Sequence, residues 1–375
     1  MQLFQADFVC YIIVNGIVMN QELKTTAISS VPSKWKSRLI AIACLVLVLL
    51  IVVAIAVSKG SSQISFATTV SIILSRIPFL NIPETWAGNI ESIVINMRMP
   101  RVVLAGVSGA ALAVAGATYQ GLFRNPLADP YLIGVSQGAA LGAVIGFLIP
   151  VSSAFWSLNI VSLFAFIGGL GAVFVVYSLG KVGKTLPMTT LILAGVALGA
   201  FLSAITSYLL ITSGSSLHGI SAWLMGGFSS PKWIHVWITV PIITLGCLFI
   251  CLFGRSLNVM QLDEEQAQQL GINVEMTKRI LLVVATLITA AAVSFGGIIG
   301  FVGIIIPHAV RLIWGPDFRF LLPLSIVTGS IFLILADLFA RTIMSPTEIP
   351  LGIVTAFFGA PFFLYLLRRK KKAVF

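Results

Sequence analysis

Few residues in this chain could do chemistry, and those few are scattered. Gly183-Lys184-Thr185 matches the second half of the phosphate-binding pattern G-x-x-x-x-G-K-[ST], in which a glycine-rich backbone surrounds the phosphates. Position 178 is Ser, so the first glycine of the pattern is missing. Lys181 and Lys184 also stand at the end of an apolar segment, where positive residues anchor membrane proteins. The sequence therefore predicts that this chain does not bind a nucleotide.

Titratable residues are rare within the apolar segments. An ion-coupled carrier needs a carboxylate or a histidine in the middle of the membrane to hold its coupling ion. Asp337 comes nearest, and its spacing of four from Arg341 predicts an ion pair on one helix face near a span end. His218, His235 and His308 are isolated, and no H-E-x-x-H motif is present. We predict no catalytic residue, metal site or cofactor, which argues against an ion-coupled carrier and an intramembrane enzyme.

The elements that carry these residues must be membrane spans. Hydrophobic residues make up 58% of the chain and charged residues only 9%, against roughly 25% charged in a soluble domain. The formal charge is +11, but Lys and Arg stand singly between apolar segments, which argues against a nucleic-acid-binding face. Four cysteines in apolar stretches lack metal-ligand spacing and are predicted to pack as small hydrophobic residues: Cys10, Cys44, Cys247 and Cys251.

Ten apolar segments approach the roughly 20 helical residues that cross a bilayer. The first follows Lys36 and Arg38 and resembles a signal peptide ending at Ala54-Ile55-Ala56, but we interpret it as a retained span because spans follow throughout. The seventh and eighth segments merge around Gly303. The predicted fold is an all-α integral membrane bundle of ten transmembrane helices, at about 39–57, 102–122, 131–150, 158–179, 187–212, 236–253, 280–306, 302–314, 320–340 and 349–367.

The two ends of the chain are predicted to be tails outside the transmembrane domain 39–367. Residues 368–375 are basic, and residues 1–38 form the N-terminal tail. Within that tail, the stretch from Phe8 to Met19 is apolar but too short to cross a membrane. Two interpretations stay open: the native chain starts at Met19, so that 1–18 are not part of it, or the stretch is an interfacial helix.

The distribution of basic residues predicts the orientation. The outer segments hold six Lys or Arg, and the inner segments hold the remaining 17 of the 23. The positive-inside rule therefore predicts that both termini are cytoplasmic. The six outer residues are Lys59, Arg76, Arg98, Arg101, Lys232 and Arg341.

Small residues recur at every fourth position in several segments. Residues four apart share a helix face, so helix backbones can approach closely along such a stripe. This spacing predicts a tightly packed bundle. The stripes are Gly109, Ala113, Ala117 and Gly121; Gly134, Gly138, Gly142 and Gly146; and Gly195, Gly199, Ser203 and Ser207.

Longer motifs follow one another in order along the chain. Arg98-Met-Pro-Arg101 opens the second span, and the segment 120–136 reads QGLFRNPLADPYLIGVS, whose two X-Pro pairs disfavour helix and mark a turn. GFVGIIIPH at 300–308 with Arg311, and the segment from Glu348 to Pro361, complete the set. In this order they resemble the FecCD-type permeases, the membrane subunits of type II, vitamin B12 importer-like ABC importers. The resemblance covers about residues 39–372.

The longest inner connection, 262–279, is predicted to contain a helix pair. A short helix begins after Asp263, carries acidic residues in its first turn and ends at Gly271, and Asn273 then caps a second helix that leads to Lys278 and Arg279. In FecCD-type permeases this pair is the coupling element, which sits in a cleft of the ATPase subunit. The resemblance therefore implies ATPase coupling by Asp263, Glu264, Glu265, Ala267, Leu270 and Gly271.

The resemblance also implies two further sites. Arg98, Arg101 and Arg341 match arginines that meet acidic residues of an extracytoplasmic binding protein. The turn from Lys181 to Pro187, with Lys184 and Thr185, is implied to be the cytoplasmic gate. The fifth span, about 190–211, and the tenth, about 350–367, are implied to line a translocation path between two permease copies.

The function implied is that of the permease subunit of a binding-protein-dependent ABC importer in the cytoplasmic membrane of a prokaryote. The chain itself is then not an ATPase, and ATP is hydrolysed by two ABC ATPase subunits. Further partners are a second permease copy or a paralogue, the binding protein and the lipid bilayer. The expected substrate is an iron chelate, a ferric siderophore, with haem or cobalamin (vitamin B12) as the alternative.

Overall fold

The computed structural model of this chain describes residues 35–60, 64–76, 79, 82–149, 160–183 and 185–371. The chain divides into two compact units, Met1–Leu47 and Val48–Phe375. Every contact given below lies within the second unit. The stretch 1–18 and residues 372–375 of the basic tail fall outside the described residues, so both interpretations of the N-terminal stretch stay predictions.

The described residues contain seven helices that are long and apolar enough to cross a membrane, together with shorter apolar helices. Three of the shorter helices, α5 (Val135–Leu148), α13 (Val302–Trp314) and α15 (Leu351–Lys371), coincide with predicted spans. The fold of about ten spans predicted from the sequence is thus confirmed. The seven long helices are Trp35–Ser58, Gly88–Leu122, α6 (Ile160–Gly180), α7 (Met188–Thr212), α9 (Trp233–Leu252), α12 (Val274–Gly296) and α14 (Phe318–Thr342).

The second long helix is continuous but not uniform. It consists of α3 (Gly88–Ser92), a π-helical segment η1 (Ile93–Arg98) and α4 (Met99–Leu122). The connections between spans carry further short elements. These are α2 (Phe66–Ser75), η2 (Pro130–Ile133), η4 (Gly214–Ser216), α8 (Leu217–Leu224), α10 (Gly254–Val259) and α11 (Glu264–Gln269).

The structure corrects the predicted seventh span in two ways. The predicted span at 280–306 extends too far toward the C-terminus. Helix α12 ends at Gly296, and a non-helical segment separates it from α13. Gly297 has φ 66°, and a Cβ there would lie 2.2 Å from the Trp223 carbonyl oxygen, so only glycine fits this break. At its other end α12 begins at Val274, directly after the cap Asn273. The predicted second coupling helix is therefore the first part of α12 and not a separate element.

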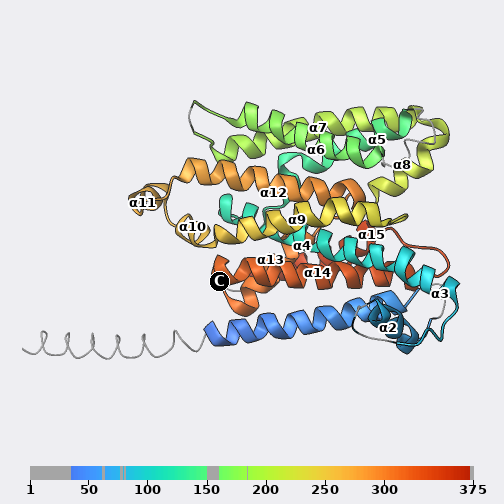
Figure 1. Cartoon of the computed structure of the whole chain (residues 1–375). Helices are drawn as coiled ribbons and strands as arrows, with labels where there is room; N and C mark the ends of the chain where they lie inside the picture. Colours follow the sequence, from blue (N-terminus) through green and yellow to red (C-terminus); the bar gives the residue numbers. More distant parts are fainter. Residues whose placement is uncertain are drawn as a thin grey trace, which may run out of the picture. The chain divides into compact units, whose positions relative to one another are not determined.

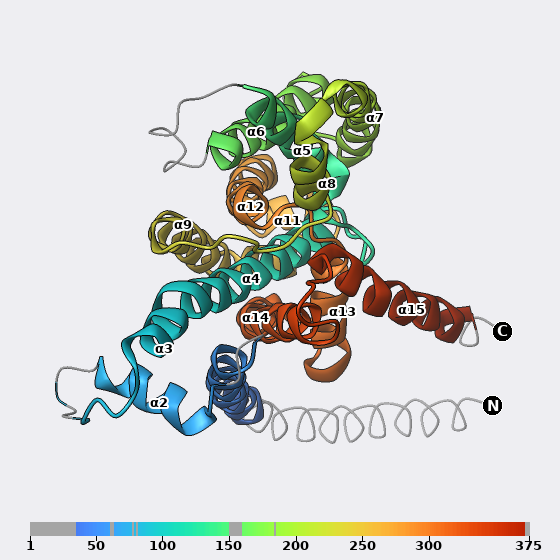
Figure 2. The same cartoon turned by 90° about the vertical axis from the view of Figure 1, so that its right-hand side faces the viewer.

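Helix α4 is the centre of the unit. It packs against α14, α12, α13 and α9, and Figure 2 shows it passing between the group α5, α6, α7 and the group α13, α14, α15. In the apolar 18-residue stretch of the helix Gly88–Leu122, to which α4 belongs, 89% of the residues are buried. In the corresponding stretch of α7, only 17% are buried. A Cβ at Gly109 would lie 2.2 Å from the Gly329 carbonyl oxygen of α14. The stripe of small residues thus forms a close backbone contact, as predicted.

Helix α5 reaches only part of the way across the membrane. Its 14 residues span about 21 Å at 1.5 Å per residue, less than the roughly 30 Å of a hydrocarbon core. It packs closely on α6, where Gly138 and Gly168 face each other. The residues before α5 form η2, which packs against α7 in the interior of the unit. The turn at 125–130 therefore leads into the bundle as well as joining two spans.

Next to α10, Asp317 fixes the start of α14. Its carboxylate accepts hydrogen bonds from the Arg319 backbone N–H (3.1 Å) and from Nδ2 of Asn258 (2.7 Å). Hydrogen bonds from the Arg319 side chain, joined by that from Asn258, lower the pKa of Asp317 to about 2 despite its partial burial. The ionised cap ties α10 to α14.

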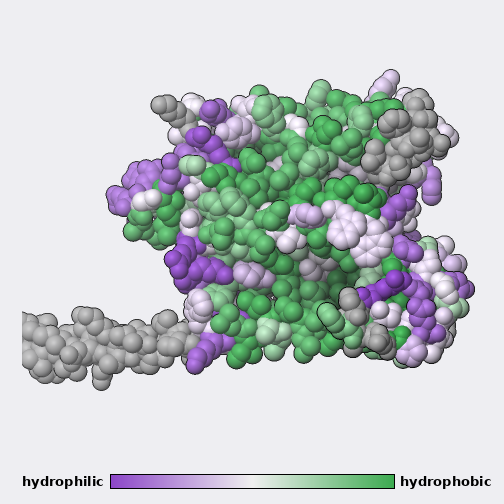
Figure 3. All heavy atoms as spheres, in the orientation of Figure 1, coloured by the Kyte–Doolittle hydropathy of each residue, from purple (hydrophilic) through white to green (hydrophobic). Residues whose placement is uncertain are grey.

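The surface of the Val48–Phe375 unit has the polarity of a membrane protein. Apolar residues cover its middle, and hydrophilic residues gather at the end that carries α11 and at the end that carries α3 (Figures 1 and 3). Large apolar side chains on the spans are exposed, among them Phe174, Trp237 and Leu252. Such a surface is stable only against lipid or another apolar chain. The chain is a multi-span membrane protein.

Candidate functional site

The first candidate element is α11, at the end of the bundle where hydrophilic residues gather. Asp263 has the extended backbone of an N-cap residue, and its carboxylate lies 3.6 Å from the Arg124 guanidinium. Gly271 has φ 84°, its N–H donates to Gln268 O, and the Ile272 N–H donates to Ala267 O. This pair of bonds is a Schellman motif, which needs a residue in the left-handed region. The predicted C-terminal glycine of this helix is confirmed.

The predicted coupling residues lie on both faces of α11. Ala267 is fully buried and anchors the helix to the bundle. The other five are exposed and form a small acidic and apolar surface: Asp263, Glu264, Glu265, Leu270 and Gly271. The arrangement is a short, rigidly capped helix presented away from the membrane spans.

The second candidate element is the turn between α6 and α7, which we call the gate turn (residues 181–187). Val182 and Thr185 exchange two backbone hydrogen bonds of 3.1 Å, and the Thr185 hydroxyl donates to Val182 O. Lys181 and Thr185 are exposed, as a turn at the membrane surface requires. Lys184 lies outside the described residues. This turn lies next to the start of α12, because the Leu186 N–H donates to Glu275 Oε2 (2.9 Å).

The three predicted docking arginines come together at the α3 end, and two of them hold the end of the first span. Arg98 donates to Val57 O (3.0 Å) and Ser58 O (2.7 Å). Arg341 donates to Lys59 O (2.9 Å) and to Ala56 O. The last carbonyls of a helix have no partner within it, and a guanidinium group is well suited to bind them. Both arginines are buried by this contact, which the sequence did not reveal.

A buried carboxylate joins the cluster. Asp337, whose side chain is 1% exposed, lies 3.0 Å from Nη2 of Arg101 and 3.3 Å from Nε of Arg341. The predicted Asp337–Arg341 ion pair is confirmed, and Arg101 is a further partner. Glu348, 48% exposed, pairs with the other side of Arg101 at 2.9 Å. The three arginines and two carboxylates of this cluster carry one net positive charge.

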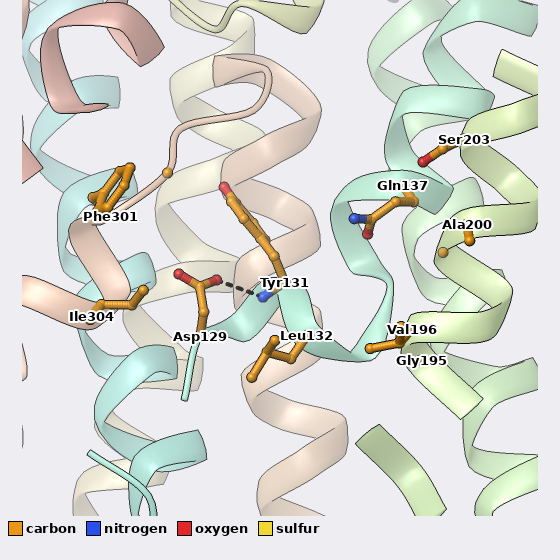
Figure 4. Close-up of a pocket in the computed structure, with 12 residues that line it drawn as sticks. Asp129, Tyr131, Leu132, Gln137, Gly195, Val196, Ala200, Ser203, Phe301 and Ile304 are labelled. Carbon is orange, nitrogen blue, oxygen red and sulfur yellow. Dashed lines mark hydrogen bonds between the residues drawn. The ribbon is translucent and has the colours of Figure 1, made fainter. Parts of the chain in front are cut away.

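A cavity of about 580 Å³ opens between η2, α5, α7 and the start of α13. Figure 4 shows Asp129 and Tyr131 between Phe301 and Ile304 on one side and Gln137 and Ser203 on the other. The Tyr131 hydroxyl donates to Ile299 O (3.0 Å) and accepts from Ile299 N–H (3.2 Å), so it holds the break before α13. This fixes one wall of the cavity.

Asp129 is a residue that the sequence did not assign to any site. Its carboxylate accepts from Tyr131 N–H (2.8 Å), and Asp129 lines the cavity, whose opposite side includes Gly195, Val196 and Gly199 of α7. Those α7 residues lie 7 to 11 positions beyond Met188, which is about 10 to 17 Å into the membrane. The two X-Pro pairs of the segment 120–136 predict a turn here. That the turn enters the bundle is indicated only by the short length of α5.

The chain matches the FecCD transport family over residues 13–369. It is 46% identical to the cobalamin import system permease protein BtuC of Halobacterium salinarum, over 77% of this chain and 76% of that protein. It is 40% identical to the hemin transport system permease protein HmuU of Yersinia pestis, over 74% and 84%. It is also 34% identical to the Fe(3+)-citrate import system permease protein YfmD of Bacillus subtilis, over 89% and 96%.

A solved structure, described as an inward-facing metal-chelate type ABC transporter, shares the fold with a TM-score of 0.75. It is 29% identical and matches 88% of this chain and 99% of its own. The architecture, the motif order and these likenesses agree along most of the chain. The chain therefore belongs to the FecCD transport family and is a membrane permease of the ABC importer class.

Proposed function

We propose that this permease carries a metal chelate across the cytoplasmic membrane, with ATP hydrolysed by two partner ATPase subunits that bind α11. The observation that supports this best is α11 itself, an exposed acidic helix fixed by a Schellman motif and anchored through Ala267. The exposed acidic and apolar side chains of this helix are available to a partner protein. Both termini are proposed to be cytoplasmic, on the side of α11.

The translocation path is proposed to form between two copies of this chain, or this chain and a paralogue. Only 17% of the apolar stretch of helix α7 is buried, and the helix carries exposed large residues such as Phe201 and Tyr208. An exposed apolar helix next to a cavity lined by α7, α5 and Phe301 fits one half of a shared path. The gate turn, with Lys181, Lys184 and Thr185, would close that path on the α11 side.

The substrate is proposed to be a metal held by a bulky organic ligand. The first candidate is an iron chelate such as a ferric siderophore. The 46% and 40% identities to permeases named for cobalamin and hemin exceed the 34% to one named for Fe(3+)-citrate. This favours a macrocyclic chelate, cobalamin or haem, as the second candidate.

Uptake by proteoliposomes decides among these substrates and tests the class of transporter. The permease, reconstituted with its ATPase and binding-protein subunits, is given radiolabelled cyanocobalamin, haemin or a ferric hydroxamate siderophore. We expect accumulation of one of them only when ATP is enclosed with the ATPase. Accumulation driven by an ion gradient without the ATPase would contradict the proposal and support a secondary carrier.

Docking of an extracytoplasmic binding protein is proposed at the α3 end, through Arg98, Arg101 and Arg341. Arg98 and Arg341 shape this surface from within, because they bind backbone carbonyls. Arg101 would meet the partner, because its outer neighbour Glu348 is half exposed and a partner carboxylate can replace it. The association of Arg101→Gln with the binding protein should be slower than wild type at low salt, and this difference should shrink at high salt.

The proposed coupling through α11 is tested by the first prediction, which concerns Gly271. A Cβ at this position would meet no atom of the described residues within 4 Å, so a substitution acts only through the backbone. Gly271→Val should disrupt the cap, because a β-branched residue disfavours φ 84°. We expect the variant to insert normally and to lose its ATPase in co-purification.

Gly271→Asn is the matched control, because Asn tolerates the left-handed region. It should keep most of the bound ATPase. Equal ATPase binding by Gly271→Val and wild type would show that the geometry of α11 is irrelevant to coupling.

A further inference from the structure

Lys278 is a buried cation close to the end of the bundle that carries α11. Its side chain is 4% exposed, although it lies only four residues beyond the first residue of α12. A lysine withdrawn from water to this degree is stable only with anionic partners. Nζ lies 2.8 Å from Glu264 Oε1 and 3.1 Å from Glu275 Oε1. The next residue, Arg279, is exposed, so of these two neighbouring cations only Lys278 is buried.

Glu275 connects this cation to the gate turn. One carboxylate oxygen, Oε1, binds Lys278, and the other, Oε2, accepts the hydrogen bond of the Leu186 N–H at 2.9 Å. Leu186 is itself buried and is followed by Pro187, directly before α7 begins. The Glu275 carboxylate therefore links the gate turn to α12.

Glu264 connects the same cation to α11. It is the first residue of that helix, and its side chain is 49% exposed. One face of this carboxylate is open to a partner protein, and the other holds Lys278. A displacement of α11 therefore changes the Lys278–Glu264 distance directly.

We propose that Glu264, Lys278 and Glu275 form a relay that transmits the position of α11 to the gate turn. Lys278 and Glu275 are positioning residues in it. When α11 moves away from Lys278, the buried ammonium group keeps only Glu275, and the carboxylate of Glu275 turns toward it. The hydrogen bond to Leu186 is then lost and the gate turn is released. This inference rests on the proposed functions of α11 and of the gate turn.

The test measures gate movement directly and needs no substrate. A cysteine replaces the exposed Val182 in a chain whose native cysteines are changed to alanine. Its alkylation rate is measured in the complex with the ATPase, with and without a non-hydrolysed ATP analogue. We expect the nucleotide to change the rate in wild type. In Lys278→Met the change should shrink about tenfold, while ATP hydrolysis and ATPase binding persist.

Two further variants separate transmission from folding. Lys278→Arg keeps the buried cation and should restore most of the nucleotide-dependent change. Arg279→Gln removes one positive charge from the neighbouring position and should behave as wild type. If Lys278→Met does not fold, Glu275→Gln is used instead: its amide oxygen can still accept from the Leu186 N–H, but it no longer binds Lys278 as an anion, so Val182 should also be uncoupled from the nucleotide.

The outcomes are distinct. A nucleotide-dependent change that persists in Lys278→Met, or in Glu275→Gln when Lys278→Met does not fold, overturns the relay and leaves the proposed function intact. A Lys278→Arg variant as impaired as Lys278→Met also overturns it, because the charge is then not what acts. A wild-type complex without any nucleotide-dependent change at position 182 overturns the proposed gate, and the relay with it.

Discussion

Asp337 holds two arginines at the α3 end and is almost completely buried. The cost of burying the carboxylate is offset because both positive partners, and the carbonyls of residues 56–59, complete one network. Removing one charge from such a network leaves the others buried without compensation. The cluster is thus stable as a whole and sensitive to any single loss.

The second prediction concerns that carboxylate. Asp337→Asn keeps the shape of the side chain but leaves Arg101 and Arg341 close together with less negative charge between them. We expect a loss of about 3 to 5 kcal/mol in stability, seen as a lower unfolding temperature in detergent. Glu348→Gln is the control, because this half-exposed partner should contribute at most about 1 kcal/mol. Equal shifts for the two variants would contradict the importance of burial.

The sequence predicted contacts within one helix and helix ends better than contacts between helices. The Asp337–Arg341 pair follows from helical spacing, and Gly271 follows from its place at a helix end. The burial of Arg98 and the Lys278–Glu264 contact do not, because Arg98 contacts residues some 40 positions away and Glu264 lies on a different helix from Lys278. Such contacts depend on how helices pack, which periodicity alone does not specify.

The ends of the helices were predicted most accurately where a proline or a capping side chain marks them. Pro187 precedes α7, and Asn273 caps α12 with a hydrogen bond to Met276 N–H. The break at 297–301 was missed because the residues on both sides are apolar and hydropathy continues through it. Glycine at 296, 297 and 300 was the only local signal, and glycine is common in membrane helices.

Contact between helix backbones gives the third prediction. At Gly109 a Cβ would lie 2.2 Å from the Gly329 carbonyl oxygen, so Gly109→Ala must push α4 and α14 apart. Overpacking of this kind costs about 1 to 3 kcal/mol or more, which should lower the unfolding temperature. Gly171→Ala on α6 is the matched control.

At Gly171 a Cβ would meet no atom of the described residues within 4 Å. That variant should be neutral or slightly stabilised, because alanine is the better helix former. A Gly109→Ala protein as stable as Gly171→Ala would mean that the two backbones can separate without cost.

At the scale of the whole molecule, the orientation in the membrane is the fourth prediction. Lys181, Arg255 and Arg319 follow or precede spans at the α11 end, which the positive-inside rule assigns to the cytoplasm. A reporter fused after Lys372 should be cytoplasmic, and one inserted between residues 213 and 232 should be extracytoplasmic. Reversed labelling of the two fusions would overturn the proposed orientation and, with it, the side on which an ATPase could bind.

The contact between α4 and α14 also has a consequence for biosynthesis. Helix α4 begins at Met99 and α14 at Phe318, so 219 residues separate their synthesis, about 10 to 40 s at ordinary translation rates. During that time the glycine face of α4 lacks its backbone partner, and Arg101 lacks Asp337. We therefore expect the nascent permease to need the insertion machinery, or a membrane chaperone, to shelter this helix. Chains truncated after Trp314 should insert but be degraded faster in pulse-chase labelling than full-length chains, and equal lifetimes would show that α4 needs no such shelter.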